Sequence, residues 1–206
     1  MTRTTKKVLL RSYYLFFAAG ISGLIYCAIV TIEARHYQSW AGARLEHSRY
    51  DAEVLLSSSV PVRSSPRALL PRISQVALVG RVQVPRLQLS AMIAEGATAH
   101  VLGLAVGHVP GTALPGQPGN MVLAAHRDTF FRRLDHLEPG DVIRITGPQV
   151  GYNYRVTFTD IVNPDETWVL QPTSGETLTL ITCYPFHFVG PAPKRFVVRA
   201  RRLDCN

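Results

Sequence analysis

The sequence predicts an all-β domain preceded by one membrane-spanning helix. Two observations carry this prediction. From about residue 76 onward, short runs of β-branched and aromatic residues alternate with Gly- and Pro-containing turns, about every 8 to 12 residues, a pattern typical of a small β-sandwich or closed barrel. Nearer the N-terminus, the 21 residues from Ser12 to Ile32 contain no charged side chain. The chain of 206 residues has room for one domain of ordinary size and an N-terminal extension.

The uncharged run is predicted to be a signal anchor. As a helix it would span about 31 Å, enough to cross a hydrocarbon core about 30 Å thick. A cleaved signal peptide is the alternative, but the run is long for one and ends without a small-x-small cleavage site. The positive-inside rule places the N-terminus in the cytoplasm and the rest of the chain outside, because four basic residues precede the run: Arg3, Lys6, Lys7 and Arg11.

Residues 34–75 are expected to connect the anchor to the β domain. From Glu33 to about Leu56 the chain is rich in alanine, leucine, glutamate and arginine, which favours an exposed helix. The segment from Ser57 to Pro66 is rich in serine and proline and is interpreted as a flexible linker. The expected domains are therefore residues 1–33, residues 34–75 and residues 76–206.

The strands expected after residue 75 are short. Tyr154–Thr159 alternates apolar and polar side chains, which indicates one buried face, whereas Leu178–Ile181 is apolar at nearly every position and is interpreted as part of a central strand, Thr177–Thr182. Turns at residues 139–141 and 146–148 bound a strand at Val142–Ile145. The other expected strands are Val82–Val84, Met121–Ala125, Trp168–Leu170 and Phe196–Arg201.

The formal net charge of +8 limits the partners to be expected. Scattered arginines fit either a surface against anionic membrane lipid or a solvated basic face. Nucleic acid is not an expected partner because no recognition motif is present. Three cysteines cannot build a dense disulfide scaffold; Cys27 lies in the uncharged run and Cys205 is one residue from the end. No zinc-type Cys/His spacing occurs, so neither a metal nor a cofactor is expected.

Three side chains suited to acyl transfer stand at the ends of predicted strands. Cys183 ends one apolar run, His126 follows another 57 residues upstream, and Arg195 begins a third 12 residues downstream. A thiolate attacks a carbonyl, an imidazole transfers protons, and a fixed guanidinium stabilises the oxyanion. If the strands of Cys183 and Arg195 are neighbours, alternation allows both side chains to face the same groove.

The motifs around these residues resemble those of the sortase family of cysteine transpeptidases. The family signature Thr-Leu-x-Thr-Cys occurs here as Thr179-Leu180-Ile181-Thr182-Cys183. One departure is His187, where an aromatic residue is expected. The other matching segments extend the resemblance over roughly residues 76 to 203, and their sequences are most similar to class D. These segments are Gly107-His108-Val109-Pro110-Gly111-Thr112, Pro118-Gly119-Asn120, His126-Arg127-Asp128-Thr129 and Ala192-Pro193-Lys194-Arg195-Phe196.

The resemblance implies a closed eight-stranded sortase-type β-barrel with short helices as the catalytic domain, residues 76–206. It implies that His126, Cys183 and Arg195 are catalytic. Further residues expected to bind substrate or to support the catalytic groups are Asn120, Asp128 and Thr182, and Arg127 with Asp128 is expected to fix the loop behind His126.

The resemblance also implies the reaction and its setting. A sortase, a hydrolase-class thiol protease and transpeptidase, would cleave a Leu-Pro-x-Thr-Gly sorting signal after its threonine through a Cys183 thioester. The acyl group would pass to an amine on the cell wall or on another protein. The partners would be surface proteins that carry the signal, and the enzyme would be a single-pass protein of a bacterial cell membrane, with its catalytic domain on the extracytoplasmic side.

Other classes fit less well. A papain-like protease places its cysteine before its histidine, and here the order is reversed. A caspase-like protease has a suitable histidine spacing, but its Gln-Ala-Cys-x-Gly signature is missing. A membrane-tethered binding module without activity stays open at this point, as does an enzyme whose acyl intermediate is hydrolysed by water.

Overall fold

The computed structural model describes residues 3–57, 76–188 and 190–203. The chain forms two compact units, residues 1–36 and residues 37–206. The helix α1 (Arg3–Ser57) belongs to both, and its side chains are described for residues 11–50. The predicted linker beyond Ser57 and the cysteine at position 205 lie outside the described residues.

In the first unit, α1 is an apolar helix with an unburied surface. All side chains from residue 11 to residue 33 are exposed, and Phe16 and Tyr26 expose 81% and 69% of their surface. By length and composition the helix is apolar enough to cross a membrane. An apolar surface on all sides of a helix is stable in hydrocarbon rather than in water. The predicted helix over Ser12–Ile32 is confirmed.

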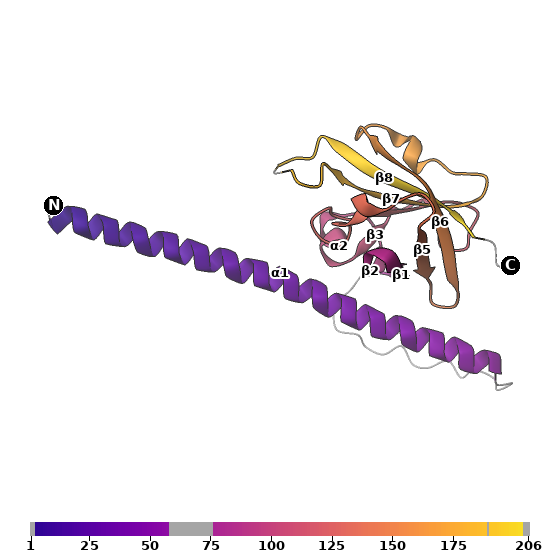
Figure 1. Cartoon of the computed structure of the whole chain (residues 1–206). Helices are drawn as coiled ribbons and strands as arrows, with labels where there is room; N and C mark the ends of the chain where they lie inside the picture. Colours follow the sequence, from indigo (N-terminus) through magenta and orange to yellow (C-terminus); the bar gives the residue numbers. More distant parts are fainter. Residues whose placement is uncertain (1–2, 58–75, 189, 204–206) are drawn as a thin grey trace. The chain divides into compact units, whose positions relative to one another are not determined.

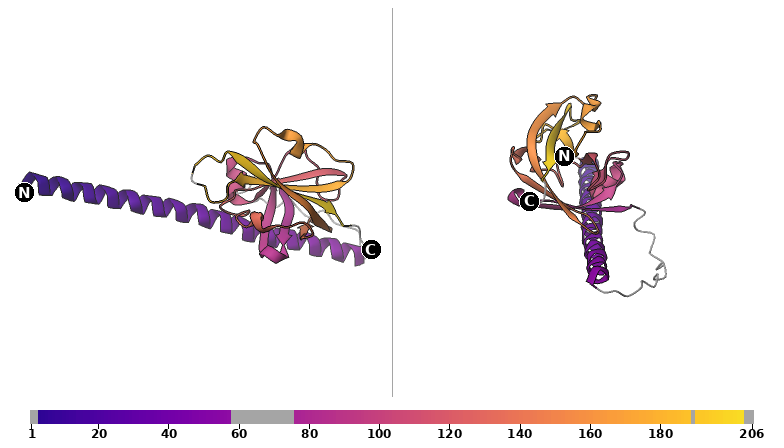
Figure 2. Two further views of the ribbon diagram at one scale, coloured as in Figure 1. Left: turned by 45° about the horizontal axis from the view of Figure 1, so that its top comes forward. Right: turned by 90° about the vertical axis from the view of Figure 1, so that its right-hand side faces the viewer.

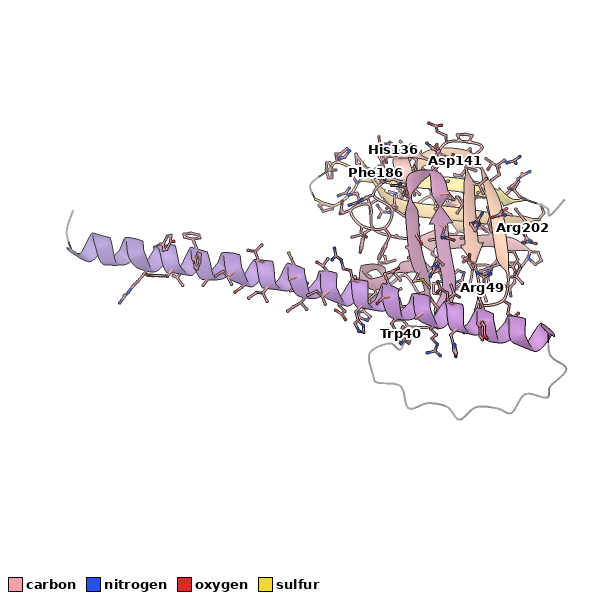
Figure 3. The ribbon with its side chains drawn as sticks, turned by 60° about the horizontal axis from the view of Figure 1, so that its bottom comes forward. Trp40, Arg49, His136, Asp141, Phe186 and Arg202 are labelled. Carbon is pink, nitrogen blue, oxygen red and sulfur yellow. The ribbon has the colours of Figure 1, made fainter. Side chains whose placement is uncertain are left out.

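In the second unit, the later part of α1 packs on the barrel domain, so the prediction of an exposed helix over residues 33–56 is wrong on one face. Tyr37, Ala41 and Leu45 follow one another at four-residue spacing and are buried against β2 (Leu89–Glu95) and α2 (Ala99–Leu104). The Gln38 side chain donates to the Leu104 carbonyl and accepts from the Met92 amide, both at 2.8 Å. Figure 3 labels Trp40 on this stretch of the helix.

Eight strands close into one barrel in the order β1-β2-β3-β4-β7-β8-β6-β5. Figure 1 shows this barrel with most of its strands labelled. The pairs β2–β3 and β4–β7 are parallel and the other pairs are antiparallel. Both views in Figure 2 show the strands wrapped around a common centre. Besides β2, the strands are β1 (Leu78–Val84), β3 (Val106–His108), β4 (Gly119–Ala124), β5 (Val142–Thr146), β6 (Gly151–Val162), β7 (Glu176–Tyr184) and β8 (Lys194–Arg202).

The barrel core is filled by inward-facing residues of all eight strands, at alternating positions along each strand, which confirms the predicted all-β class. Leu178 and Leu180 of β7 and Val198 of β8 are fully buried in it. The strand β7 lies between β4 and β8, and its residues from Thr177 to Leu180 are buried on both faces, so the prediction that it is central is confirmed. Burial of such side chains supplies most of the stability of a small barrel.

Two strands were not predicted, and one prediction was wrong. The segment of β2 contains Ala, Met and Glu, which favour helices. The strand β3 has only three residues, and its Gly107 approaches the carbonyl of Gly96 so closely that a Cβ would lie 2.3 Å from that oxygen. Trp168–Leu170, predicted as a strand, lies in the 3₁₀ helix η3 (Thr167–Leu170). It connects β6 to β7 and covers the outside of the barrel through Val169.

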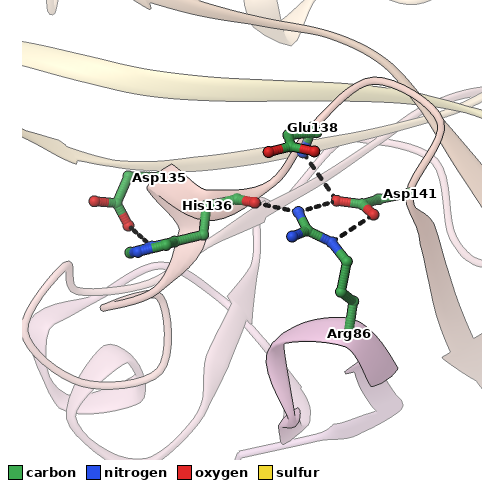
Figure 4. Close-up of polar contacts among 5 residues, drawn as sticks. All are labelled: Arg86, Asp135, His136, Glu138 and Asp141. Carbon is green, nitrogen blue, oxygen red and sulfur yellow. Dashed lines mark hydrogen bonds and ion pairs between the residues drawn. The ribbon is translucent and has the colours of Figure 1, made fainter.

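One ion pair ties two connections at the barrel end (Figure 4). Arg86, in the 3₁₀ helix η1 (Pro85–Leu87), donates to both carboxylate oxygens of Asp141, at 2.7 and 2.5 Å, and to the carbonyl of His136. His136 ends the 3₁₀ helix η2 (Leu134–His136). The hydrogen bond from Arg86 lowers the pKa of Asp141 and so favours the ionised carboxylate. In this form Asp141 and Arg86 hold the turn before β5 in place.

Candidate active site

Cys183 and Arg195 lie directly opposite each other on neighbouring strands. The antiparallel register of β7 with β8 pairs Cys183 with Arg195 and Thr182 with Phe196. Directly opposite residues share one face of a sheet, with Cβ atoms about 5 Å apart. The two strands are therefore neighbours, as the prediction of a common groove requires, and both side chains are partly exposed.

This pair points away from the barrel core. Leu180 and Val198 face the core, and alternation turns their neighbours, Ile181 and Val197, to the outer face together with Cys183 and Arg195. Ile181 and Val197 form an apolar cluster there with Val162 of β6 and Val169 of η3. Cys183 is a free thiol. An accessible thiol beside an apolar floor and a guanidinium can take up the carbonyl group of an extended peptide.

His126 reaches the same end of the barrel through the parallel strand β4. Ala124 pairs with Ile181, and the Ala125 amide donates to the Ile181 carbonyl at 3.3 Å. Two further steps along both strands lead to His126 and Cys183. The imidazole is exposed. The amides of Thr129 and Phe131 donate to the His126 carbonyl at 3.4 and 3.2 Å, which holds the backbone in a turn directly after the histidine.

Thr182 joins the two strands at this end. Its buried hydroxyl donates to the Ala125 carbonyl at 2.7 Å. A hydrogen bond therefore connects Thr182, which precedes Cys183, to Ala125, which precedes His126, although the two residues are 57 positions apart in the sequence. A buried hydroxyl with a carbonyl partner stabilises one arrangement, because a change would leave both groups unsatisfied.

Arg127 organises the connection between Cys183 and Arg195. Its guanidinium is buried and donates to three carbonyls of the β7–β8 connection: Pro185 at 2.7 Å, Phe188 at 2.7 Å and Gly190 at 3.2 Å. It also lies 5.9 Å from the centre of the Phe188 ring. Arg127 was expected to fix the loop behind His126; the structure shows that it fixes the loop on the other side of the site. Sequence order gives no sign of this contact.

The remaining predicted residues lie at different distances from the thiol. Asp128 is exposed, with a carboxylate oxygen 3.5 Å from Nε of Arg127. Asn120 is buried near the start of β4, where its register partner is Thr177, about 20 Å along the strand from Cys183. Its amide nitrogen donates to the carbonyls of Val169 and Gln171, at 2.8 and 3.1 Å, and its oxygen accepts from Thr179 at 2.6 Å. Asn120 therefore fastens η3 to the barrel wall.

Arg195 has part of its guanidinium committed to its own backbone. Nη1 donates to the carbonyls of Ala192 and Lys194, at 3.2 and 3.0 Å. Within the described part of the chain, Nε and Nη2 have no hydrogen-bond partner. Those atoms are the ones that can turn toward an oxygen above Cys183. No group of three His, Cys, Asp or Glu side chains is arranged for a metal ion among the described residues.

Comparison with known proteins agrees with this geometry. The model of the sortase domain matches residues 82–203. Sortase D of Bacillus subtilis is 38% identical over 125 residues, which are 60% of this chain and 63% of that protein, so the match spans less than two thirds of the relative. A putative sortase of the same organism, YwpE, is 35% identical over 69 residues, or 32% of this chain and 68% of that protein.

Solved structures show the same fold. The sortase D5 transpeptidase of Clostridium perfringens superimposes with a TM-score of 0.62 at 24% identity, covering 84% of this chain and 99% of that one. Sortase C-1 of Actinomyces oris has a TM-score of 0.59 at 28% identity, covering 79% and 99%. The family model spans more than half of the chain, and the sequence motifs of the chain are most similar to those of class D sortases. The chain belongs to the sortase family.

Proposed function

We propose that this protein is a membrane-anchored cysteine transpeptidase that cleaves a Leu-Pro-x-Thr-Gly sorting signal after the threonine. The observation that carries the proposal is the register of β7 with β8, which sets Cys183 opposite Arg195 beside the end of β4, where His126 follows. Membership of the sortase family supports the reaction class. The substrates would be sorting-signal-bearing surface proteins, and the acceptor an amine on the cell wall or on another protein.

In the first step, the thiolate of Cys183 attacks the threonine carbonyl carbon and a C–S bond forms. The negative charge that develops on the carbonyl oxygen is stabilised by the free guanidinium edge of Arg195. The C–N bond to glycine then breaks, and the imidazolium of His126 gives its proton to the leaving amine. The products are a Cys183 thioester, a neutral His126 and a free glycine amine.

In the second step, an amine of the acceptor attacks the thioester carbonyl. His126 accepts the proton that the amine loses, the C–S bond breaks, and the Cys183 thiolate is restored. The partly exposed side chain of Ile181, which packs on the buried Val197, would contact the substrate and keep water from the thioester. Thr182 and Arg127 act by position: they hold the two strand ends and the β7–β8 connection at which these groups stand.

We also propose that α1 crosses the membrane with its basic end in the cytoplasm. The support is the charge-free run from Ser12 to Ile32, its exposed apolar surface and the basic residues before it. The barrel would then act on the extracytoplasmic side of a bacterial cell membrane.

The full-length protein in detergent should form a thioester with a Leu-Pro-x-Thr-Gly peptide, with the residue x varied across a set, seen as an added mass on the intact protein. Cys183→Ala should form none, whereas Cys205→Ser should react like the parent. An adduct on the Cys183→Ala protein would show that Cys183 is not the nucleophile. Triglycine should be ligated to the peptide. Release of free acid alone would indicate a peptidase, and no reaction even with a thiol-directed probe would indicate a binding module.

Arg195→Lys keeps the charge but loses the planar fork, so a directed contact to the oxyanion predicts a large loss in turnover. Loss of one oxyanion donor costs about 3 kcal/mol, or roughly a hundredfold in rate. The measurement is the single-turnover rate of thioester formation at saturating peptide, with circular dichroism to show an intact fold. Arg144→Lys on β5 is the matched control and should react at the parental rate. Equal rates for both variants would remove Arg195 from the mechanism.

Thr182→Val keeps the shape of the side chain and removes the hydrogen bond to Ala125. We expect the single-turnover rate to fall by about tenfold to a hundredfold, because a small misplacement of a catalytic group has effects of this size. Thr182→Ser should restore most of the rate. Thr179→Val, on the same strand as Thr182, removes the buried hydrogen bond to Asn120 of β4. It should lower the melting temperature while the rate stays within a few-fold. A slow Thr182→Ser protein would contradict the positioning role.

The anchor is tested in intact cells that express Cys205→Ser protein. A membrane-impermeant maleimide should label Cys183 from outside and leave Cys27 unlabelled, because Cys27 lies within the membrane-crossing run. Cys183→Ser in the same background should remain unlabelled. Intact-mass measurement should find the segment before Glu33 retained. A shorter form that begins after Ile32 and leaves the membrane would show a cleaved signal peptide instead.

A further inference from the structure

A concave pocket lies on the outer face of the barrel, away from Cys183. It has a volume of about 770 Å³ and is formed by the last residues of β8, the turn before β7, and η3. The pocket lies beside the paired residues Thr177 of β7 and Arg201 of β8. This pair is six residue pairs from Cys183 and Arg195, or about 20 Å along the strands. The mechanism above uses none of its residues.

The pocket is basic. Three arginines, Arg199, Arg201 and Arg202, line it, against one carboxylate, Glu176. Glu176 is committed to Arg202, with Nη1 and Oε2 2.5 Å apart, and the Arg202 guanidinium lies 4.4 Å from the centre of the Tyr152 ring. Arg202 is labelled in Figure 3. Two of the three cations thus remain without a carboxylate partner among the residues that the structure describes.

Arg199 carries a hydrogen-bond donor with no acceptor. Its Nη2 donates to the Val169 carbonyl at 3.0 Å, and its guanidinium lies 5.3 Å from the centre of the Trp168 ring. Its Nε is buried and has no partner within the described ranges. Burial lowers the pKa of Arg199, the direction expected of a cation held out of water. An unmet donor on a buried charged group is rare in proteins, and it leaves the charge of Arg199 poorly compensated.

Arg201 adds a second, accessible cation on the same face. It stands two residues after Arg199 on β8, about 7 Å away along the strand. On the neighbouring strand β6 it is paired directly with Arg155. Like charges directly opposite each other destabilise a sheet, and an anion between them removes the repulsion. In the described chain, no side chain partners Arg201.

The donors suit a phosphate group better than a single carboxylate. A carboxylate is satisfied by one guanidinium fork, whereas the oxygens of a phosphate can accept from two separate guanidinium groups and a hydroxyl at once. Arg199, Arg201 and the hydroxyl of Ser174 all line this pocket. The pocket is much larger than one phosphate, and Trp168 forms part of its wall, which leaves room for an organic body attached to the anion.

We propose that this pocket binds a phosphate group. The phosphate can come from the headgroup of an anionic phospholipid or from a soluble phosphate, and the chemistry of recognition is the same for both. Binding would place an anion beside the guanidinium groups of Arg199 and Arg201 and would offset the repulsion between Arg201 and Arg155. The proposal does not depend on the transpeptidase reaction, because none of the residues proposed to be catalytic lines the pocket.

The test uses the fluorescence of Trp168 in the full-length chain. The only other tryptophan is Trp40, so a Trp40→Phe protein in detergent reports on the pocket alone. Titration with inorganic phosphate should change the Trp168 emission along a saturation curve, and sodium chloride at equal ionic strength should not. Arg201→Gln should weaken phosphate binding about tenfold or more, since it removes a charge-assisted contact.

Two further variants separate recognition from net charge. Arg144→Gln removes the same charge from β5 and should bind phosphate like the parent, whereas Arg201→Lys should bind with intermediate strength. Circular dichroism should show the parental fold in each. No saturable response, or one that Arg201→Gln leaves unchanged, would overturn the proposal, and so would equal weakening by Arg144→Gln.

The source of the phosphate follows from the same signal in lipid nanodiscs. If phospholipid occupies the pocket, protein in phosphatidylglycerol discs should show the phosphate-saturated emission and give no response to added phosphate, whereas protein in phosphatidylcholine discs should respond. If the ligand is soluble, both discs should respond alike. A Trp168 signal insensitive to phosphate and equal in the two discs would contradict both sources.

Discussion

The candidate site depends on the side-by-side pairing of three strands, β4, β7 and β8. The parallel register of β4 with β7 brings the end of one strand to the end of the other, so that the residue after Ala125 arrives beside Cys183. The antiparallel register of β7 with β8 sets Arg195 opposite the same cysteine. A slip of one residue in either pairing would turn the side chains to the other face of the sheet. Closure of the barrel, which leaves no free strand edge, holds both registers.

Two buried polar contacts reinforce this arrangement where the strands end. Thr182 bonds the strand of the thiol to the strand of the imidazole, and Arg127 gathers three carbonyls of the connection that leads to Arg195. A loop that exposes its carbonyls has many conformations of similar energy, and a buried guanidinium with several donors selects one of them. In the proposed reaction, such preorganisation places the charges before the oxyanion forms.

The outer face of β7 and β8 has two chemically different zones. Near Cys183 it is apolar, where Ile181 packs on the buried Val197, and near Thr177 it is basic. The 3₁₀ helix η3 contributes to both, through Val169 in the apolar cluster and Trp168 in the wall of the basic pocket. The Val169 carbonyl accepts from both Asn120 and Arg199, so the same contacts that hold η3 in place connect the two zones.

Local sequence determined the features that arise from local chemistry. The uncharged run from Ser12 to Ile32 sufficed for the apolar helix, because length and polarity alone decide whether a helix suits hydrocarbon. The alternation in Tyr154–Thr159 and the unbroken apolar run before Cys183 sufficed for β6 and β7. The family motif named Cys183, His126 and Arg195 as candidates, and the strand order then brought Cys183 opposite Arg195.

Only the tertiary structure decided the features that depend on contacts between distant residues. The segment Leu89–Glu95 contains helix formers but becomes β2 because it pairs with β1 and β3 in the closed barrel. Trp168–Leu170 has strand-like residues but curls into η3, since Val169 is buried against the outer face. Arg127 and Arg199 look like ordinary surface arginines in the sequence. Their roles follow from partners some 30 to 60 residues away in the chain, and no local pattern encodes a pairing of that range.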